Sequence, residues 1–178
     1  MTLIFLKNLF WRVRLAMFRL PTEAKDWYKN IQASKMKTPL FVEEWDLYYL
    51  CLLYGITEGE SEVKDLHKAQ DMSKNFTLRY TGSKYSLLTL LMMAHANRFK
   101  IDLTNREQLE EALNGFIDQA QDSGFSLKAI DKMNQYAYAG FDLLSDKVPA
   151  LTNSSVGIDE IFKDLNKKMD NFIKKFTL

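Results

Sequence analysis

One stretch of the sequence, residues 45–56, is apolar on almost every side and constrains the fold most strongly. No charged residue occurs from Leu47 to Thr57. A helix without a polar face belongs in the centre of a protein, because water solvates it poorly. Gly55 follows Tyr54, and glycine readily adopts the left-handed conformation that ends many helices. The sequence therefore predicts a central helix over residues 42–54 that ends at Gly55.

A second stretch, residues 84–98, is also apolar on nearly all sides. It contains Leu87, Leu88, Leu90, Leu91, Met92, Met93 and Ala94. We expect this helix to pack against the central one, since each needs an apolar neighbour to cover it.

Hydrophobic periodicity predicts further helices elsewhere in the chain. They cover residues 22–33, a segment from a Thr104–Glu107 capping box to a stop at 122–124, residues 126–145 capped by Ser126, and residues 157–176. Residues 62–71 could form a short helix, while residues 18–20 and 76–80 alternate in the manner of short strands. Only 7 Gly and 3 Pro occur in 178 residues, which disfavours a turn-rich sheet protein. The predicted fold class is mainly α, a single compact helical domain of six to seven helices with at most one or two short strands.

The domain boundary falls near residue 150. Residues 1–150 are predicted to form the helical core domain, and residues 151–178 a linker and a C-terminal amphipathic helix. The apolar side chains of that helix recur at steps of three and four: Phe162, Leu165, Met169, Phe172 and Phe176. Such a stripe either folds back on its own domain or docks on a partner as an amphipathic helix in a groove.

The N-terminal segment, residues 1–20, combines apolar side chains with basic ones. Its pattern fits both a strand and a basic amphipathic helix, and Phe10 and Trp11 are candidate partner contacts. This segment could pack on the core, bind a partner or lie on a membrane surface. Although the net charge is only +1, the bases near this end form a candidate nucleic-acid patch, consisting of Arg12, Arg14, Arg19, Lys35 and Lys37.

Residues that could carry chemistry are few. Cys51 is the only cysteine and lies inside the most apolar stretch, which predicts a buried, inert thiol and a reducing, cytoplasmic location. His67 and His95 are the only histidines and belong to different elements, and no glycine-rich phosphate loop is present. The sequence therefore predicts a protein that is not an enzyme and holds no cofactor or metal.

Residues 18–56 resemble a ribbon-helix-helix unit. Phe18-Arg19-Leu20 forms the short strand, Pro21-Thr22-Glu23-Ala24 opens the first helix, and Trp45 to Tyr54 forms the second. The same segment is similar, more faintly, to the DndE family of bacterial DNA-modification operons. In ribbon-helix-helix proteins the outward strand residues read DNA, so the resemblance implies that Arg19, with Arg12 and Arg14, would contact the bases.

These observations give three functional hypotheses. The first is a non-enzymatic accessory subunit of a larger bacterial complex, with a partner such as an ATPase or nuclease, in a DNA-handling antiphage system. The second is a DNA-binding module that uses the basic N-terminal patch. The third is a peripheral membrane protein held by residues 1–20, and a membrane is the least expected of the partners.

Overall fold

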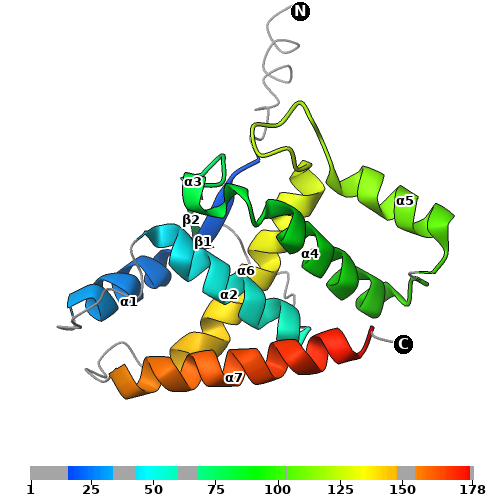
Figure 1. The fold of residues 1–178 in the computed structure, drawn as a ribbon. Coiled ribbons are helices and arrows are strands. Elements are labelled where there is room, and N and C mark those ends of the chain that lie inside the picture. Colours follow the sequence, from blue (N-terminus) through cyan, green and yellow to red (C-terminus); the bar gives the residue numbers. More distant parts are fainter. Residues whose placement is uncertain (1–15, 34–42, 60–67, 103, 148–154, 177–178) are drawn as a thin grey trace, which may run out of the picture.

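Two helices, α2 (Glu44–Glu58) and α6 (Leu127–Lys147), cross at the centre of the protein (Figure 1). The structure is a computed structural model and describes residues 16–33, 43–59, 68–102, 104–147 and 155–176. Within these ranges the chain has seven helices and one two-stranded antiparallel sheet, which confirms the predicted mainly α class. The other elements are β1 (Phe18–Pro21), α1 (Thr22–Ala33), β2 (Ala69–Ser73), α3 (Leu78–Thr81), α4 (Lys84–Phe99), α5 (Arg106–Phe116) and α7 (Ser155–Lys174).

The crossing of α2 and α6 depends on a glycine from each helix. A Cβ atom on Gly140 would lie 1.8 Å from the carbonyl oxygen of Cys51, and one on Gly55 would lie 1.9 Å from the carbonyl oxygen of Tyr136. The two backbones therefore touch directly. The prediction that Gly55 ends the central helix is wrong, because this glycine allows the close approach instead. The helix continues to Glu58 and is capped by Gly59, which has φ 72° and donates its N–H to the carbonyl of Gly55.

A buried amide fastens β1 to these two helices. Asn134 of α6 accepts hydrogen bonds from the Arg19 backbone N–H (2.9 Å) and the Tyr48 hydroxyl (3.0 Å). Its own side-chain N–H donates to the carbonyl of Met17 (2.9 Å). Since buried polar groups are costly unless paired, these bonds fix the position of the strand.

The strand β1 pairs with β2 in an antiparallel register in which Arg19 lies opposite Asp71. This outcome corrects the helix expected over residues 62–71, since Ala69–Ser73 form a strand and residues 60–67 lie outside the described residues. The strand expected at residues 18–20 is present as Phe18–Pro21. Pro21 is the last residue of this strand, and α1 covers Thr22–Ala33, as predicted for residues 22–33.

Phe18 is the centre of an aromatic cluster beneath the sheet. Its ring centroid lies 4.7 Å from that of Trp45, 5.5 Å from that of Tyr48 and 5.0 Å from that of Phe76. The strand expected at residues 76–80 is absent: Leu78–Thr81 form the short helix α3. Phe76 lies just before α3 and Tyr80 lies within it, and the rings of both contact the ring of Trp45. This shared contact, and not a strand, explains why apolar residues recur here.

The connection between α4 and α6 differs from the prediction at both ends of α5. The Thr104–Glu107 capping box does not form; Asn105 caps the helix by accepting the N–H of Gln108 (3.1 Å). The helix ends at Phe116, before the expected stop, since Ile117 pairs with Phe125 in an isolated bridge. The predicted Ser126 cap of α6 is confirmed, because its hydroxyl accepts the N–H of Ala129 (3.2 Å).

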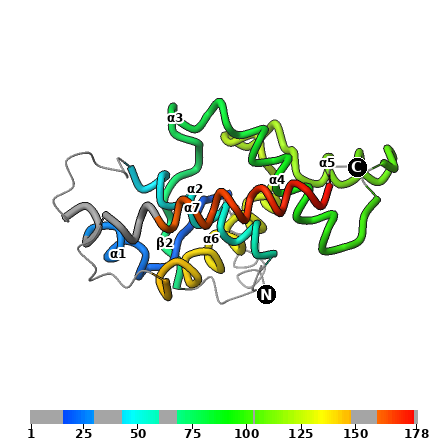
Figure 2. The backbone as a smooth tube through the Cα atoms, turned by 60° about the horizontal axis from the view of Figure 1, so that its bottom comes forward, coloured from blue at the N-terminus to red at the C-terminus, as the bar shows by residue number. Residues whose placement is uncertain are grey.

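The last helix, α7, runs across α2 along one side of the molecule. This arrangement is visible from the front and from below (Figures 1 and 2). The C-terminal helix is therefore seated on the core formed by the earlier elements.

Candidate functional site

The apolar stripe of α7 faces the rest of the chain. Leu165 and Phe172 are buried, and so is Ile161. Phe162, Met169 and Phe176 are partly buried and pack against the core. The stripe was expected either to fold back on its own domain or to dock on a partner, and these residues fold back on their own domain. Phe162, Met169 and Phe176 nevertheless keep part of their apolar surface exposed.

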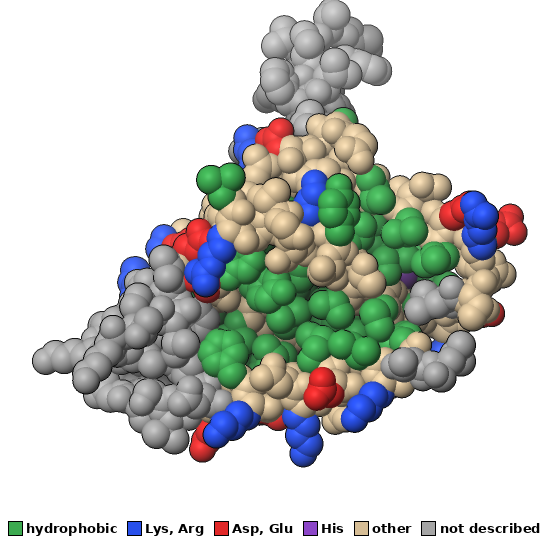
Figure 3. Space-filling view, in the orientation of Figure 1, with side chains coloured by type: hydrophobic (Ala, Val, Ile, Leu, Met, Phe, Trp, Pro, Cys, Tyr) green, Lys and Arg blue, Asp and Glu red, His purple; other side chains and the backbone are tan. Residues whose placement is uncertain are grey.

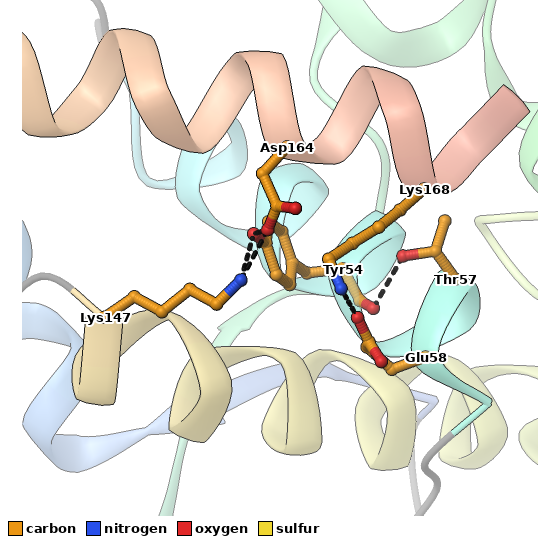
Figure 4. Close-up of polar contacts among 6 residues, drawn as sticks. All are labelled: Tyr54, Thr57, Glu58, Lys147, Asp164 and Lys168. Atoms are coloured by element: carbon orange, nitrogen blue, oxygen red, sulfur yellow. Dashed lines mark hydrogen bonds and ion pairs between the residues drawn. The ribbon is translucent and has the colours of Figure 1, made fainter. Parts of the chain in front are cut away.

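A group of polar side chains fastens α7 to α2 and to the end of α6 (Figure 4). The Tyr54 hydroxyl and the Lys147 ammonium both donate to the carboxylate of Asp164. Lys147 also donates to the Tyr54 hydroxyl (3.1 Å), and Lys168 forms an ion pair with Glu58. We call Tyr54, Lys147 and Asp164 the polar anchor.

The polar anchor shifts the pKa of each of its members. Burial, and then the bond to Asp164, raises the pKa of the Tyr54 hydroxyl. The same carboxylate raises the pKa of Lys147. Burial acts to raise the pKa of Asp164, but the hydrogen bonds from Lys147 and Tyr54 outweigh it, and the pKa lies below its ordinary value of 3.8. The ionised carboxylate is thus the form that the fold favours.

The replacement Asp164→Asn should lower the free energy of unfolding at pH 7 by about 1 kcal/mol, because half-exposed ion pairs contribute little more. Because the pKa of Asp164 is lower in the folded protein, its contribution is present above pH 3.8 and is lost as the pH falls through the folded value. Urea unfolding of both proteins at several pH values should therefore give a difference that narrows below pH 3.8. Asp170→Asn, at an exposed position of α7, is the control and should change little. A difference that does not depend on pH would contradict the assignment.

Hydrophobic side chains gather on the face of the molecule that carries α2, α4 and α7 (Figure 3). Five hydrophobic residues of these three helices are only partly buried and pack against the core: Tyr49, Leu90, Met93, Phe162 and Met169. We call these five residues the apolar face. Lys, Asp and Glu side chains border the hydrophobic area along its lower edge (Figure 3). Partly exposed apolar surface within a charged rim is typical of a protein-docking surface.

The surroundings of the apolar face add aromatic side chains. Tyr49 lies 5.1 Å from Tyr80 of α3, ring to ring. Nearby in the chain, Leu78 is 97% exposed and Tyr85 is 64% exposed. Aromatic residues with one polar end are favoured at interfaces, because they contribute apolar area and a hydrogen bond together.

No protein-family model, curated protein or solved structure matches this chain. Any function must therefore be inferred from the residues and their arrangement in this chain.

The predicted basic patch is only partly within the described residues. Arg19 lies on β1 and forms an ion pair with Asp71 at 2.6 Å, so the charge of its guanidinium is neutralised inside the chain. The other bases, Arg12, Arg14, Lys35 and Lys37, lie outside the described residues, as do the candidate partner contacts Phe10 and Trp11.

The groups that could carry chemistry are dispersed. Cys51 is buried in α2, and burial raises the pKa of its thiol. Across the described ranges, no three His, Cys, Asp or Glu side chains lie together in a way that could hold a metal ion. His95 is half-buried beside Phe99 and Phe116. In the same ranges, no helix has the length and apolar character that crossing a bilayer requires.

Sequence reasoning missed the polar anchor and part of the apolar face. Asp164 and Lys168 are four residues apart beside the apolar stripe of α7, a spacing that indicates a second contact line on the helix. Leu90 and Met93 were indistinguishable from core residues, since α4 is apolar on nearly all sides. Only the tertiary arrangement shows which side of that helix is left partly uncovered.

Proposed function

We propose that this protein is a non-enzymatic accessory subunit of a larger bacterial assembly and that it binds a larger protein through the apolar face. Two observations support the proposal: hydrophobic side chains gather on the face that carries α2, α4 and α7 (Figure 3), and five hydrophobic residues of these helices are only partly buried. Exposed apolar surface costs free energy in water, and a partner that covers it recovers this cost.

The cellular setting of the proposal comes from the resemblance of residues 18–56. A DndE-like or ribbon-helix-helix-like segment favours a cytoplasmic assembly that handles DNA, such as an antiphage system, with an ATPase or nuclease as the larger subunit. Direct reading of DNA by Arg19 has less support than partner binding, because the Arg19 guanidinium already forms an ion pair with Asp71.

Affinity purification of the tagged full-length protein from its native cells tests the proposal. We expect a stoichiometric protein partner that survives nuclease treatment. The variants Leu90→Glu and Met93→Glu should abolish its capture, since each introduces a charge into the apolar face that the partner would have to bury. Ser86→Glu, at an exposed position of the same helix, should retain the partner. Equal capture by all these variants, with unchanged helical circular dichroism, would show that the apolar face is not the docking surface.

A further inference from the structure

Four basic side chains from α4 and α6 lie near one another, and two of them contact the ring of Phe116. His95 has its ring 5.2 Å from the Phe116 ring, and the Lys128 ammonium lies 5.5 Å from that ring. Arg98 and Lys132 are each one helical turn further along α4 and α6, and both act electrostatically on His95. We call these four residues the basic cluster.

The charges of the two lysines of the basic cluster, Lys128 and Lys132, are poorly compensated by the protein. Lys128 and Lys132 are four residues apart, where like charges on a helix repel. Lys128 also lies in the first turn of α6, which contains no acid, at the end of the helix where the dipole disfavours a cation. Within the part of the chain that the structure describes, neither lysine forms an ion pair, and Lys132 donates only to the side-chain oxygen of Gln135 (2.9 Å).

The crowded positive charges help to lower the pKa of two members of the basic cluster, His95 and Lys132. Burial, followed by Lys128, Lys132 and Arg98, lowers the pKa of His95. Burial, Arg98 and Lys128 lower the pKa of Lys132, while the neighbouring Asp131 raises it. A fold that holds cations together in this way gains free energy when a polyanion binds there.

An exposed aromatic ring lies at the edge of the basic cluster. Phe99 is 55% exposed, and its ring centroid is 4.4 Å from that of His95. It occupies the last residue of α4, immediately after Arg98. Proteins that bind single-stranded nucleic acids combine cations along the backbone with aromatic rings on which bases stack.

We propose that the basic cluster and Phe99 form a binding site for single-stranded nucleic acid, in which Arg98, Lys128 and Lys132 contact phosphates and Phe99 stacks on a base. The exposed ring favours a single strand over a duplex, whose bases are already stacked. It also favours nucleic acid over an acidic peptide, whose carboxylates use the charges but not the ring. This site is separate from the apolar face, and its existence does not depend on the proposed subunit function.

Fluorescence anisotropy with the full-length protein and a labelled mixed-sequence 20-nucleotide DNA strand tests the site. The double variant Lys128→Gln/Lys132→Gln should weaken binding about tenfold and reduce the slope of log affinity against log salt by about 1.4, because two phosphate contacts are lost. Phe99→Ala should also weaken binding about tenfold through the loss of one stacked base. Lys163→Gln/Lys167→Gln has the same spacing and charge change on exposed positions of α7, and it should bind like the unaltered protein.

Several results would overturn the site. Absence of binding at low salt would do so, as would unchanged binding by the Lys128/Lys132 double variant, which would assign any affinity to other bases such as Arg12 and Arg14. Equal binding of a duplex of the same length, or unchanged affinity in Phe99→Ala, would remove the stacking role and the preference for a single strand. If polyglutamate displaces the strand at equal charge concentration, the surface binds acidic chains in general.

Discussion

Replacing Gly140 with alanine is expected to destabilise the protein by about 3 kcal/mol, although alanine is the better helix former. The added methyl group would lie 1.8 Å from the carbonyl oxygen of Cys51 and 2.8 Å from the backbone nitrogen of Gly55. Both neighbours are backbone atoms of a helix, so they cannot rotate away as a side chain would. Relief requires the whole of α2 to move from α6, and this loosens the contact on which the core is built.

Gly115→Ala is the matched control for this prediction. Its added methyl group would meet only the Lys128 ammonium, at 3.5 Å, which is an ordinary contact with a flexible side chain. This variant should be slightly more stable than the unaltered protein, by about 0.5 kcal/mol, because alanine loses less backbone entropy in a helix. Chemical unfolding followed by circular dichroism measures both changes. A Gly140→Ala protein as stable as the control would mean that the two helices are not in backbone contact.

The central crossing explains how the two proposed surfaces are positioned. Helices α4 and α7 both pack against α2, and these three helices carry the residues of the apolar face. The other end of α6 brings Lys128 and Lys132 toward His95 of α4. Each of the two crossing helices thus carries part of one proposed surface: Tyr49 of α2 belongs to the apolar face, and Lys128 and Lys132 of α6 belong to the basic cluster.

The sequence predicts most of the helices because each carries a periodic apolar face. The helices expected at residues 22–33, 84–98 and 126–145 agree closely with α1, α4 and α6. The errors occur where tertiary contacts override local signals. Gly55 is typical of a helix end, but here it allows the backbones of α2 and α6 to approach closely. The pattern of Phe76 and Tyr80 is typical of a strand, but both rings contact Trp45 from in front of and within the short helix α3.

The candidate surfaces are less predictable than the fold, because they join residues from distant elements. The partly exposed side of α4 cannot be recognised in a helix that is apolar all round. The basic cluster combines residues about 30 positions apart in the chain, from His95 to Lys128, and no local charge run marks it. The stripe of α7 was visible from its spacing, but spacing alone does not distinguish its own core from a partner.

Phe18→Ala is expected to lower the free energy of unfolding by about 3–5 kcal/mol, the range for removing a large buried aromatic side chain. Phe18 is fully buried, and its ring is in edge contact with those of Trp45, Tyr48 and Phe76. The resulting cavity would lie between β1 and α2, among the rings of Trp45, Tyr48 and Phe76. These neighbours are themselves large rings and cannot collapse into the space without losing their own contacts.

Tyr85→Ala removes an aromatic ring of similar size from an exposed position and should change stability by less than about 0.5 kcal/mol. Tyr85 is 64% exposed, and its ring centroid lies 4.9 Å from the Lys84 ammonium. Comparing the two variants by urea unfolding separates burial in the cluster from a general effect of losing an aromatic residue. Similar small losses in both would show that Phe18 does not hold β1 against α2. A large loss confined to Phe18→Ala would show that the N-terminal strand is part of the core, and would thereby explain how β1 keeps Arg19 opposite Asp71.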